Sequence, residues 1–512
     1  MIQNDDAPFG LREFLARAGE PQSRRPWPRV VLDRDQWLGL RDLLKTVDWS
    51  FLAIWAEDRI VHAALRDEAD GAIGIVSLPC PTNRFPSLGG MRPGALRMER
   101  WIKDLTGLVA EDEPDTRPWL DHGTWRLERP LSSAPEERPA DREPVPYAFL
   151  AAEGPGLHQI PVGPVHAGII EPGHFRFTAN GEVIVRLEER LGYVHKGTQH
   201  LMRGKLPEEA ARLAGRISGD STVAHAFAFA RAVETALDLE VPIRAVWLRA
   251  LMAEIERIAN HFGDVGAVCN DAAFPLLHAE CGFLRERVLQ TARLCFGHRL
   301  MMDCVRPGGV SVDLAEEGNA ALAKLIPELR RAFARVVAIY DSKASLLDRT
   351  VGTGVTLPAL VHRFAAGGYV GRAAGRAVDV RRSPGYAPYE ELEFEVPVLP
   401  EGDVNARVWI RIREIEQSLR LVEQILVHMP SGPIEVQTPR RGGEGSALVE
   451  GFRGDIFTWI RLGEAGRVAA CWPRDPSWLQ WPLLEAAIED NIVADFPLCN
   501  KSFNCSYSGH DL

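Results

Sequence analysis

RAVWLRALMAEIERIANHFGDVGAVC, residues 244–269, is the clearest structural signal in the chain. Its apolar residues recur every three or four positions over several turns, which is the spacing of one face of an α-helix. No proline interrupts the pattern. The stretch therefore predicts a long amphipathic helix that buries one face against other helices.

Two further stretches, 319–348 and 403–429, carry the same helical spacing, so we expect a helical bundle. Residues 175–195 differ, because two alternating runs flank Ala179-Asn180-Gly181, and Asn-Gly is a strong signal for a β-hairpin turn. We therefore expect an α+β protein in which the main domain is a mostly helical bundle with a small β-sheet.

The domain organisation follows from changes in composition along the chain. Residues 1–125 mix short apolar runs with a helix-like stretch at 95–108, which predicts a small α/β domain. Residues 126–146 are rich in Pro, Arg and Glu and lack hydrophobic periodicity, so they predict an exposed linker. Residues 147–512 form the second predicted domain.

Composition narrows the class of protein. The 512 residues are 46% hydrophobic and 25% charged, with a net charge of −11 that argues against nucleic acid as a partner. No apolar run is long enough to span a membrane and no signal-peptide pattern opens the chain, so we expect a cytosolic protein that can still dock on membrane subunits. The eight cysteines form no C-x-x-C pair; we expect buried, reduced thiols and no iron–sulfur cluster held by this chain.

Nucleotide-binding and hydrolase motifs such as the P-loop and G-x-S-x-G are absent from the sequence. Several polar residues instead stand near predicted turns and helix starts. Taken singly, each is best interpreted as a capped turn or a hydrogen-bonded core group; together they form a candidate proton-handling pocket. They are His166, His174, Tyr193, His195, Asp220 and His225. Within RISGDS (216–221), Gly219 ends one helix, and Asp220 or Ser221 is expected to cap the next.

Segments in a fixed order give the chain a resemblance to the large subunit of group 4 nickel–iron hydrogenases and to the 49-kDa subunit of respiratory complex I. They are IPVGPVHAGIIEPGHFRF (160–177), AEIERIANHFGDVG (253–266), VRPGGVSVDL (305–314), DRTVGTGV (348–355) and GYAPYEELEFEVPVLPEG (385–402). MERWIKDLTGL (98–108) and PDTRPWLDHGTW (114–125) resemble the 30-kDa subunit of complex I. A fusion of these two parts resembles the formate hydrogenlyase and hydrogenase-4 large subunits.

The resemblance points to a lost metal centre. Hydrogenases of this kind hold nickel and iron with cysteines in R-x-C-G-x-C and D-P-C-x-x-C motifs. Here the first motif falls on RISGDS, with Ser218 and Ser221 at the ligand positions, and the second on NCSYSG (504–509), with Ser506 and Gly509. A hydroxyl is a hard, weakly acidic donor that cannot bridge two metals as thiolate does. The chain also stops three residues past the last ligand position, without the tail that nickel-acquiring precursors carry. We expect no bound metal.

In complex I the corresponding cavity binds quinone, and the resemblance implies roles there for a histidine of the first hairpin loop and a tyrosine near the first lost cysteine. His166 occupies the loop in this chain, whereas the tyrosine position falls at or near Ser218. We expect catalytic roles for His166, Asp220 and His225. We expect His166, Ser218, Ser221 and Ser506 to line the vacated cavity.

The resemblance implies an oxidoreductase subunit of a membrane-associated, energy-converting complex. Implied partners are a small subunit with a 4Fe–4S cluster, a ferredoxin-like electron-transfer subunit and antiporter-like, proton-pumping membrane subunits. Quinone is the expected substrate, and the expected location is the cytoplasmic side of the inner membrane. Two alternatives stay open: a structural coupling subunit with an inert former active site, and a working nickel–iron hydrogenase.

Overall fold

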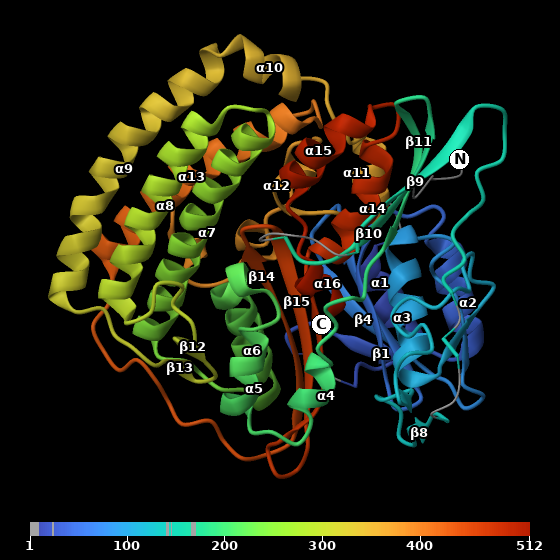
Figure 1. The fold of residues 1–512 in the computed structure, drawn as a ribbon. Helices are drawn as coiled ribbons and strands as arrows, with labels where there is room; N and C mark the ends of the chain where they lie inside the picture. Colours follow the sequence, from blue (N-terminus) through green and yellow to red (C-terminus); the bar gives the residue numbers. More distant parts are fainter. Residues whose placement is uncertain (1–9, 23–24, 140–142, 145, 165–169) are drawn as a thin grey trace, which may run out of the picture. The chain divides into compact units, whose positions relative to one another are not determined.

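The computed structural model describes residues 10–22, 25–139, 143–144, 146–164 and 170–512. The chain divides into two compact units (Figure 1). Residues 1–148 with 363–365 make up the first unit, and residues 149–362 with 366–512 make up the second. Helices and sheets occur in both units, which confirms the α+β class.

A four-stranded sheet of order β1-β4-β3-β2 forms the centre of the first unit. Strands β2 (Trp49–Glu57), β3 (Ile60–Asp67) and β4 (Ile73–Pro79) are antiparallel, and β1 (Arg29–Val31) pairs with β4 in parallel. The three long strands are buried over nearly their whole length, so both faces of the sheet are covered. Other elements of this unit are α1 (Leu11–Ala18), α2 (Arg34–Leu43), α3 (Leu96–Thr106), β5 (Arg84–Pro86) and β6 (Val109–Glu111).

The segment expected as an exposed linker, 126–146, contains a short pair of strands. Its strand β7 (Leu127–Glu128) pairs antiparallel with β8 (Glu136–Glu137). Leu131 between them is 8% exposed. Arg138 donates hydrogen bonds to Asp121 at 2.9 Å and to Glu128 at 2.8 Å. Charged contacts therefore hold a segment that carries no hydrophobic periodicity.

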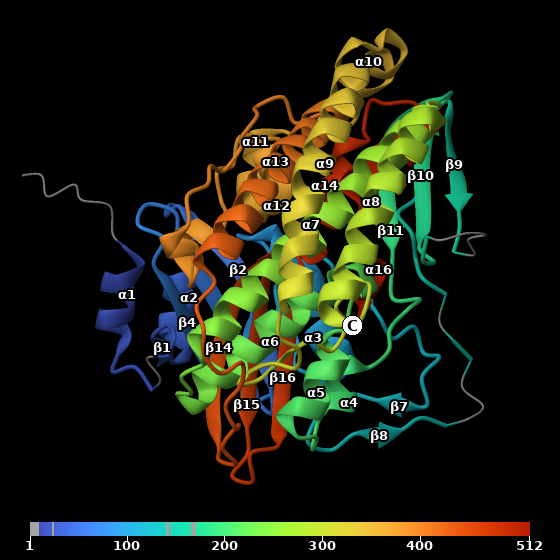
Figure 2. The same cartoon turned by 90° about the vertical axis from the view of Figure 1, so that its left-hand side faces the viewer.

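Long helices dominate the second unit, where α7 (Ile243–Asp271) contacts α8 (Pro275–Phe296) and α13 (Val404–His428), and α8 contacts α9 (Glu316–Ser342) (Figures 1 and 2). The helices predicted at 244–269 and 403–429 are confirmed as α7 and α13. The helix predicted at 319–348 is interrupted: α9 ends at Ser342, Lys343 is extended, and α10 (Ala344–Thr350) follows.

Helix α7 is buried on nearly every side, including its charged residues. Burying an unpaired charge is costly, so each charge needs a partner. Arg249 makes two hydrogen bonds to Glu234, at 2.9 and 2.5 Å. His261 lies 2.7 Å from Glu414 on α13. The central helix is therefore fixed by polar pairing as well as by apolar packing.

Two three-stranded sheets flank the bundle of the second unit. One has the order β11-β10-β9, from β9 (Leu157–Val162), β10 (His174–Asn180) and β11 (Val183–Arg190). The predicted hairpin is confirmed: Asn180 pairs with Val183, and Gly181 between them has a φ of +60°. The other sheet holds β14 (Gly443–Gly451), β15 (Gly454–Leu462) and β16 (Val468–Arg474).

Shorter elements complete the second unit. They are α4 (Thr198–Met202), α5 (Pro207–Ala214), α6 (Thr222–Leu237), β12 (Val305–Arg306), β13 (Gly309–Val310), α11 (Pro358–Phe364), α12 (Gly368–Arg372), α14 (Ser477–Ala487), α15 (Phe496–Phe503) and α16 (Tyr507–Asp511). Within the described ranges, none of the helices has the length and apolar character needed to cross a bilayer.

Candidate functional site

Two loops from opposite ends of the second unit's sequence meet at one point. The first runs from α5 to α6 and carries Ser218; the second joins α15 to α16 and carries Ser506. The two hydroxyl oxygens are 2.7 Å apart, although the residues are separated by 288 positions. Ser506 also accepts a hydrogen bond from the backbone N–H of Gly509 at 2.9 Å and so caps α16.

The observed N-terminal cap of α6 differs from the cap predicted from RISGDS. Ser221 occupies the N-cap position of α6, but its side chain makes no capping bond. Instead, the carboxylate of Glu256 on α7 accepts from the backbone N–H groups of Val223 at 2.7 Å and Ala224 at 3.0 Å. Because Glu256 supplies the cap from a neighbouring helix, the side chain of Asp220 is available for another contact.

That contact is an ion pair with Arg453, which stands in the turn between β14 and β15. The guanidinium donates to both Asp220 carboxylate oxygens, at 2.7 and 2.6 Å. The side chain of Asp220 is 35% exposed, against 4% for Arg453. Desolvation alone would raise the pKa of Asp220, but the charge and hydrogen bonds of Arg453, with a bond from Ser218, lower it below its usual value. Asp220 is thus an ionised carboxylate that remains accessible.

A cavity of about 580 Å³ adjoins these loops. One part of its lining, which we call the polar wall, consists of Ser218, Asp220, Arg453 and Ser506. An apolar wall contains Val162, Ile170, Phe175, Phe496, Pro497 and Tyr507. The remaining lining residues are Gly163, Glu171, Gly173, Gly219, Asp271, Asn500, Lys501, Asn504, Cys505 and Ser508. An apolar cavity with a few convergent polar groups is the usual form of a small-molecule site.

Of the residues expected from the sequence, Ser218, Asp220 and Ser506 come together at the polar wall. Ser221 is not among the cavity-lining residues; its hydroxyl accepts from Arg453 at 3.2 Å. His166 lies outside the described residues. Gly163 and Ile170, which flank it in the chain, do line the cavity.

His225 is also absent from the cavity lining and lies behind the Ser506 loop. Its Nε2 is 2.9 Å from the carboxylate of Asp475, and both side chains are fully buried. Burial opposes ionisation of Asp475, but the hydrogen bond and charge of His225 lower its pKa to about 2. Ser477 joins Asp475 to the loop, because its N–H donates to Asp475 while its hydroxyl accepts from Ser506 N–H at 2.8 Å.

The other polar residues singled out from the sequence make separate local contacts. His174 bonds the backbone oxygen of Gly163 at 3.2 Å, and His195 bonds that of Asp511 at 2.7 Å. The guanidinium of Arg190 lies 5.2 Å from the ring of Tyr193. The two histidines bond to backbone oxygens, as the single-residue interpretation predicts, whereas the contact of Tyr193 is with a cation.

No pattern in the sequence points to three residues that shape the site: Arg453, Tyr507 and Lys196. Tyr507 packs its ring against Trp481, with centroids 4.8 Å apart, and lines the cavity. The ammonium group of Lys196 donates to the backbone oxygens of Ile217 and Ser508, each at 3.3 Å, and so ties the two loops together. These contacts join segments that are far apart in the sequence, so a local sequence pattern does not predict them.

Potential metal ligands are sparse. No group of three or more His, Cys, Asp or Glu side chains in the described part of the chain is arranged to hold a metal ion. All eight cysteines are buried and none of them forms a disulfide, as expected from the sequence. Cys505 alone of the eight lines the cavity.

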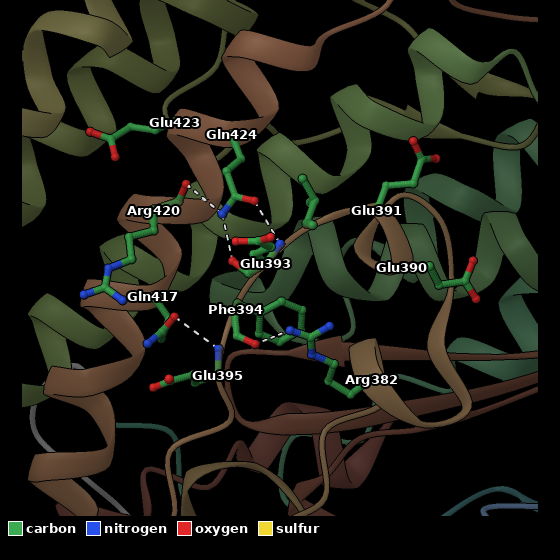
Figure 3. A pocket seen from close by; sticks show the side chains of 11 residues that line it. Arg382, Glu390, Glu391, Glu393, Phe394, Glu395, Gln417, Arg420, Glu423 and Gln424 are labelled. Carbon is green, nitrogen blue, oxygen red and sulfur yellow. Dashed lines mark hydrogen bonds between the residues drawn. The ribbon is translucent and has the colours of Figure 1, made fainter.

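A second, larger hollow of about 820 Å³ lies elsewhere on this unit, between the segment 390–395 and α13 (Figure 3). Gln424 of α13 accepts from the backbone N–H of Glu393 and donates to its backbone oxygen, at 2.9 and 2.7 Å. These bonds fix an extended segment on the helix. The glutamates at 390, 391, 393 and 395 are exposed, so this hollow lacks the enclosed polar groups of the Ser218 cavity.

Comparison with known families divides the second unit between two descriptions. Residues 280–443 match the family model "Respiratory-chain NADH dehydrogenase, 49 Kd subunit". Residues 196–263 match the model "Nickel-dependent hydrogenase". The Ser218 loop lies within the hydrogenase match.

Individual relatives agree. Formate hydrogenlyase subunit 5 of Escherichia coli is 30% identical over 438 residues, covering 83% of this chain and 77% of the relative. An NADH-quinone oxidoreductase subunit of Dehalococcoides mccartyi is 32% identical over 306 residues, covering 58% of this chain and 83% of the relative. A solved chain of the membrane-bound sulfane sulfur reductase, an archaeal respiratory membrane complex, superimposes with a TM-score of 0.66 at 26% identity, covering 70% of this chain and 99% of that one.

These relatives are oxidoreductase subunits of hydrogenase and respiratory complexes, and the two family matches include the Ser218 loop and the helices of the bundle. The resemblance seen in the sequence motifs is thereby confirmed. The chain belongs to the family of hydrogenase-like large subunits that includes those of the energy-converting group 4 hydrogenases and the 49-kDa subunit of complex I.

Proposed function

We propose that this chain is the large subunit of a membrane-associated, energy-converting redox complex, that it holds no nickel–iron centre, and that its cavity receives a quinone-type electron acceptor. The observation that carries the proposal is the pairing of Ser218 with Ser506 at the two positions where the family motifs place metal-binding cysteines. Family membership supplies the redox context, and the cavity supplies the binding site.

The donor set does not fit nickel and iron. Ser218, Ser221 and Ser506 offer hydroxyls at three motif positions, and Gly509 offers no side chain at the fourth. The hydroxyls of Ser218 and Ser506 are engaged with each other. A Cβ atom on Gly509 would lie 2.6 Å from Cγ of Asp475, so any side chain there would displace a buried carboxylate. The fourth position is therefore closed as well as empty of a donor atom.

The cavity suits both the apolar ring and the polar oxygens of a quinone head group. Its apolar wall presents aromatic and aliphatic surface to a ring, and its polar wall presents hydrogen-bonding groups to a ring oxygen. Reduction of a quinone to a quinol takes two electrons and two protons, with one O–H bond formed at each carbonyl oxygen. In this proposal the electrons come from a 4Fe–4S cluster of a small partner subunit.

The residues of this chain would then bind and orient the ring and handle protons at its oxygens. Asp220, ionised beside Arg453, carries no proton to donate, so the two protons of reduction would come from water; Asp220 would accept a hydrogen bond from the ring hydroxyl that forms and, in the reverse direction, would accept its proton. His225 contributes through Asp475 and Ser477, which hold the Ser506 loop in place. His166 stays a predicted contact from the loop between Gly163 and Ile170.

Family membership supports the proposal of further partners. We include antiporter-like, proton-pumping membrane subunits and a ferredoxin-like electron-transfer subunit, with this chain peripheral on the cytoplasmic side of the inner membrane. The sulfane sulfur reductase relative makes sulfane sulfur the second candidate acceptor. The apolar wall favours the quinone, because aromatic side chains pack well against a ring but give a small polar anion no hydrogen bonds.

The test uses the purified complex. Elemental analysis is expected to find nickel far below one atom per chain, and a short-chain benzoquinone is expected to bind saturably. Gly219 lines the cavity with open space around its Cβ position, so Gly219→Phe should block binding, whereas the matched Gly219→Ala should not. Stoichiometric nickel would restore the hydrogenase alternative. Saturable binding of polysulfide with no quinone binding would favour the second acceptor, and binding of neither would leave a structural coupling subunit.

A further inference from the structure

The polar wall of the cavity has a definite hydrogen-bond polarity. Ser218 donates to the carboxylate of Asp220 at 2.9 Å, because an ionised carboxylate only accepts. The hydroxyl hydrogen of Ser218 is thereby used. In the 2.7 Å contact with Ser506, Ser218 must accept and Ser506 must donate. The chain of donation runs from Ser506 to Ser218 to Asp220.

As a result, both serine hydrogens point away from a ligand. Ser506 already accepts from the N–H of Gly509 and keeps one lone pair; its neighbour Ser508, 3.5 Å away, is too distant for a strong bond. A ligand oxygen that approaches Ser506 therefore meets an acceptor. The same holds at Ser218, whose hydrogen and one lone pair are both engaged.

Asp220 adds a second acceptor. Its Oδ1 accepts from Ser218 and Arg453, whereas its Oδ2 accepts only from Arg453 within the described structure. Oδ2 thus retains a lone pair on a side chain that is 35% exposed. The guanidinium that could donate is 4% exposed, so a ligand reaches the carboxylate first.

Other lining residues serve both forms of the ligand. The ammonium group of Lys501 donates to a quinone carbonyl or to a quinol hydroxyl, since both oxygens carry lone pairs. The hydroxyl of Tyr507 accepts a long contact from Asn500 at 3.5 Å and can rotate to donate or accept. It serves a carbonyl and a hydroxyl equally well. Selection between the two rests on Ser218, Asp220 and Ser506.

We propose that the polar wall selects a ligand that donates a hydrogen bond, so that the cavity binds the quinol form more tightly than the quinone form. This inference rests on the proposed function. A quinone carbonyl placed against Ser218, Ser506 and the Asp220 carboxylate would face acceptors, because the donor of this wall, the guanidinium of Arg453, is nearly buried and already donates to Asp220. A quinol hydroxyl at the same place donates to Asp220 or Ser506. The resting site is thus complementary to the reduced product or, in the reverse direction, to a quinol substrate.

The experiment measures equilibrium binding to the purified complex by calorimetry, without oxygen or an electron donor. The ligands are a short-chain 1,4-benzoquinone, its hydroquinone and the dimethyl ether of that hydroquinone. We expect the hydroquinone to bind about tenfold or more tightly than the quinone, since its bond is to a charged acceptor. The ether has the same ring but no donor, and should bind no better than the quinone.

Variants of the wall sharpen the test. Ser218→Ala removes the acceptor of the Ser506 hydrogen and frees it for the ligand, so quinone affinity should rise and the preference shrink. Asp220→Asn replaces an acceptor with an amide that also donates, so the preference for the hydroquinone should shrink. If that variant fails to fold, Ser218→Ala and the three ligands still test the preference. Ser446→Ala removes a buried hydroxyl that does not line the cavity and should leave the preference unchanged.

Each outcome has a distinct meaning. Equal affinity for the two forms, or tighter binding of the quinone, would overturn the selection and leave the quinone cavity standing. Failure of all three ligands to bind would overturn both the selection and the quinone proposal. A preference that survives Ser218→Ala unchanged would show that the wall does not produce it.

Discussion

Ser218 and Ser506 share a 2.7 Å hydrogen bond across 288 residues of chain. The bond links the α5–α6 loop to the α15–α16 loop, and it joins two positions that the motif resemblance assigns to metal-binding cysteines. A contact that is 2–4% exposed at both ends stabilises the fold as well as shaping the cavity.

The strength of this bond can be measured with a double-mutant cycle. Ser218→Ala and Ser506→Ala should each destabilise the protein, and the pair should lose less than the sum, with a coupling of about 0.5–1.5 kcal/mol. Denaturant unfolding provides the free energies. Ser218→Ala combined with Ser342→Ala, an exposed helix residue, should be additive. Additivity of the first pair would mean that the contact contributes nothing.

Gly509 should tolerate no side chain. Gly509→Ala places a Cβ 2.6–2.7 Å from the carboxylate of Asp475, and we expect a loss of about 1–3 kcal/mol in unfolding free energy. The matched change Gly219→Ala, in the other loop, meets no atom within 4 Å and should be nearly neutral. Thermal melts of the two variants make the comparison; equal melting temperatures would contradict the closed fourth position.

The ion pair of Arg453 needs a guanidinium. Arg453→Lys keeps the positive charge but loses the paired bonds to Asp220 and the contact with the Phe452 ring, 4.4 Å away. We expect about 1–3 kcal/mol of destabilisation, because Asp220 is partly solvated and retains water as a partner. If Arg453→Lys matched the wild type in denaturant unfolding, the bidentate geometry would be irrelevant to stability.

Stability should fall in acid through Asp475. Its folded pKa of about 2 lies below the unfolded value of about 3.9, so its contribution is complete above about pH 4 and is lost as the pH falls towards 2. The contribution is about 2–3 kcal/mol. Asp475→Asn should be less stable at neutral pH and show a shallower acid limb in melts recorded across this range. If the acid limb of Asp475→Asn matched that of the wild type, the loss of stability at low pH would come from other carboxylates.

Lys196 should hold the two loops together. Lys196→Met keeps the length of the side chain but removes its bonds to the backbone of Ile217 and Ser508. Hydrogen exchange at residues 216–221 and 504–509 should become faster, while exchange in α7 should not change. Lys196→Arg retains a donor and serves as the control. Protection that stays the same in Lys196→Met would show that other contacts suffice.

Local pattern was sufficient for much of the architecture. The spacing of apolar residues placed α7 and α13, and Asn180-Gly181 placed the hairpin between β10 and β11, because these features depend on neighbours in the chain. The same spacing did not reveal the break at Lys343, because the apolar pattern continues across the point where α9 ends and α10 begins. The predicted cap of α6 was wrong because the capping residue, Glu256, comes from another helix.

The candidate site divides in the same way. The motif resemblance implies that serine and glycine stand where the family has cysteine, and the order of amino acids puts Asp220 next to two of these positions. Folding adds four relationships that no motif contains: Ser218 meets Ser506, Arg453 fixes Asp220, Asp475 lies under Gly509, and His225 is turned away from the cavity. Such contacts depend on how distant segments pack, and packing is a property of the whole fold rather than of any local pattern.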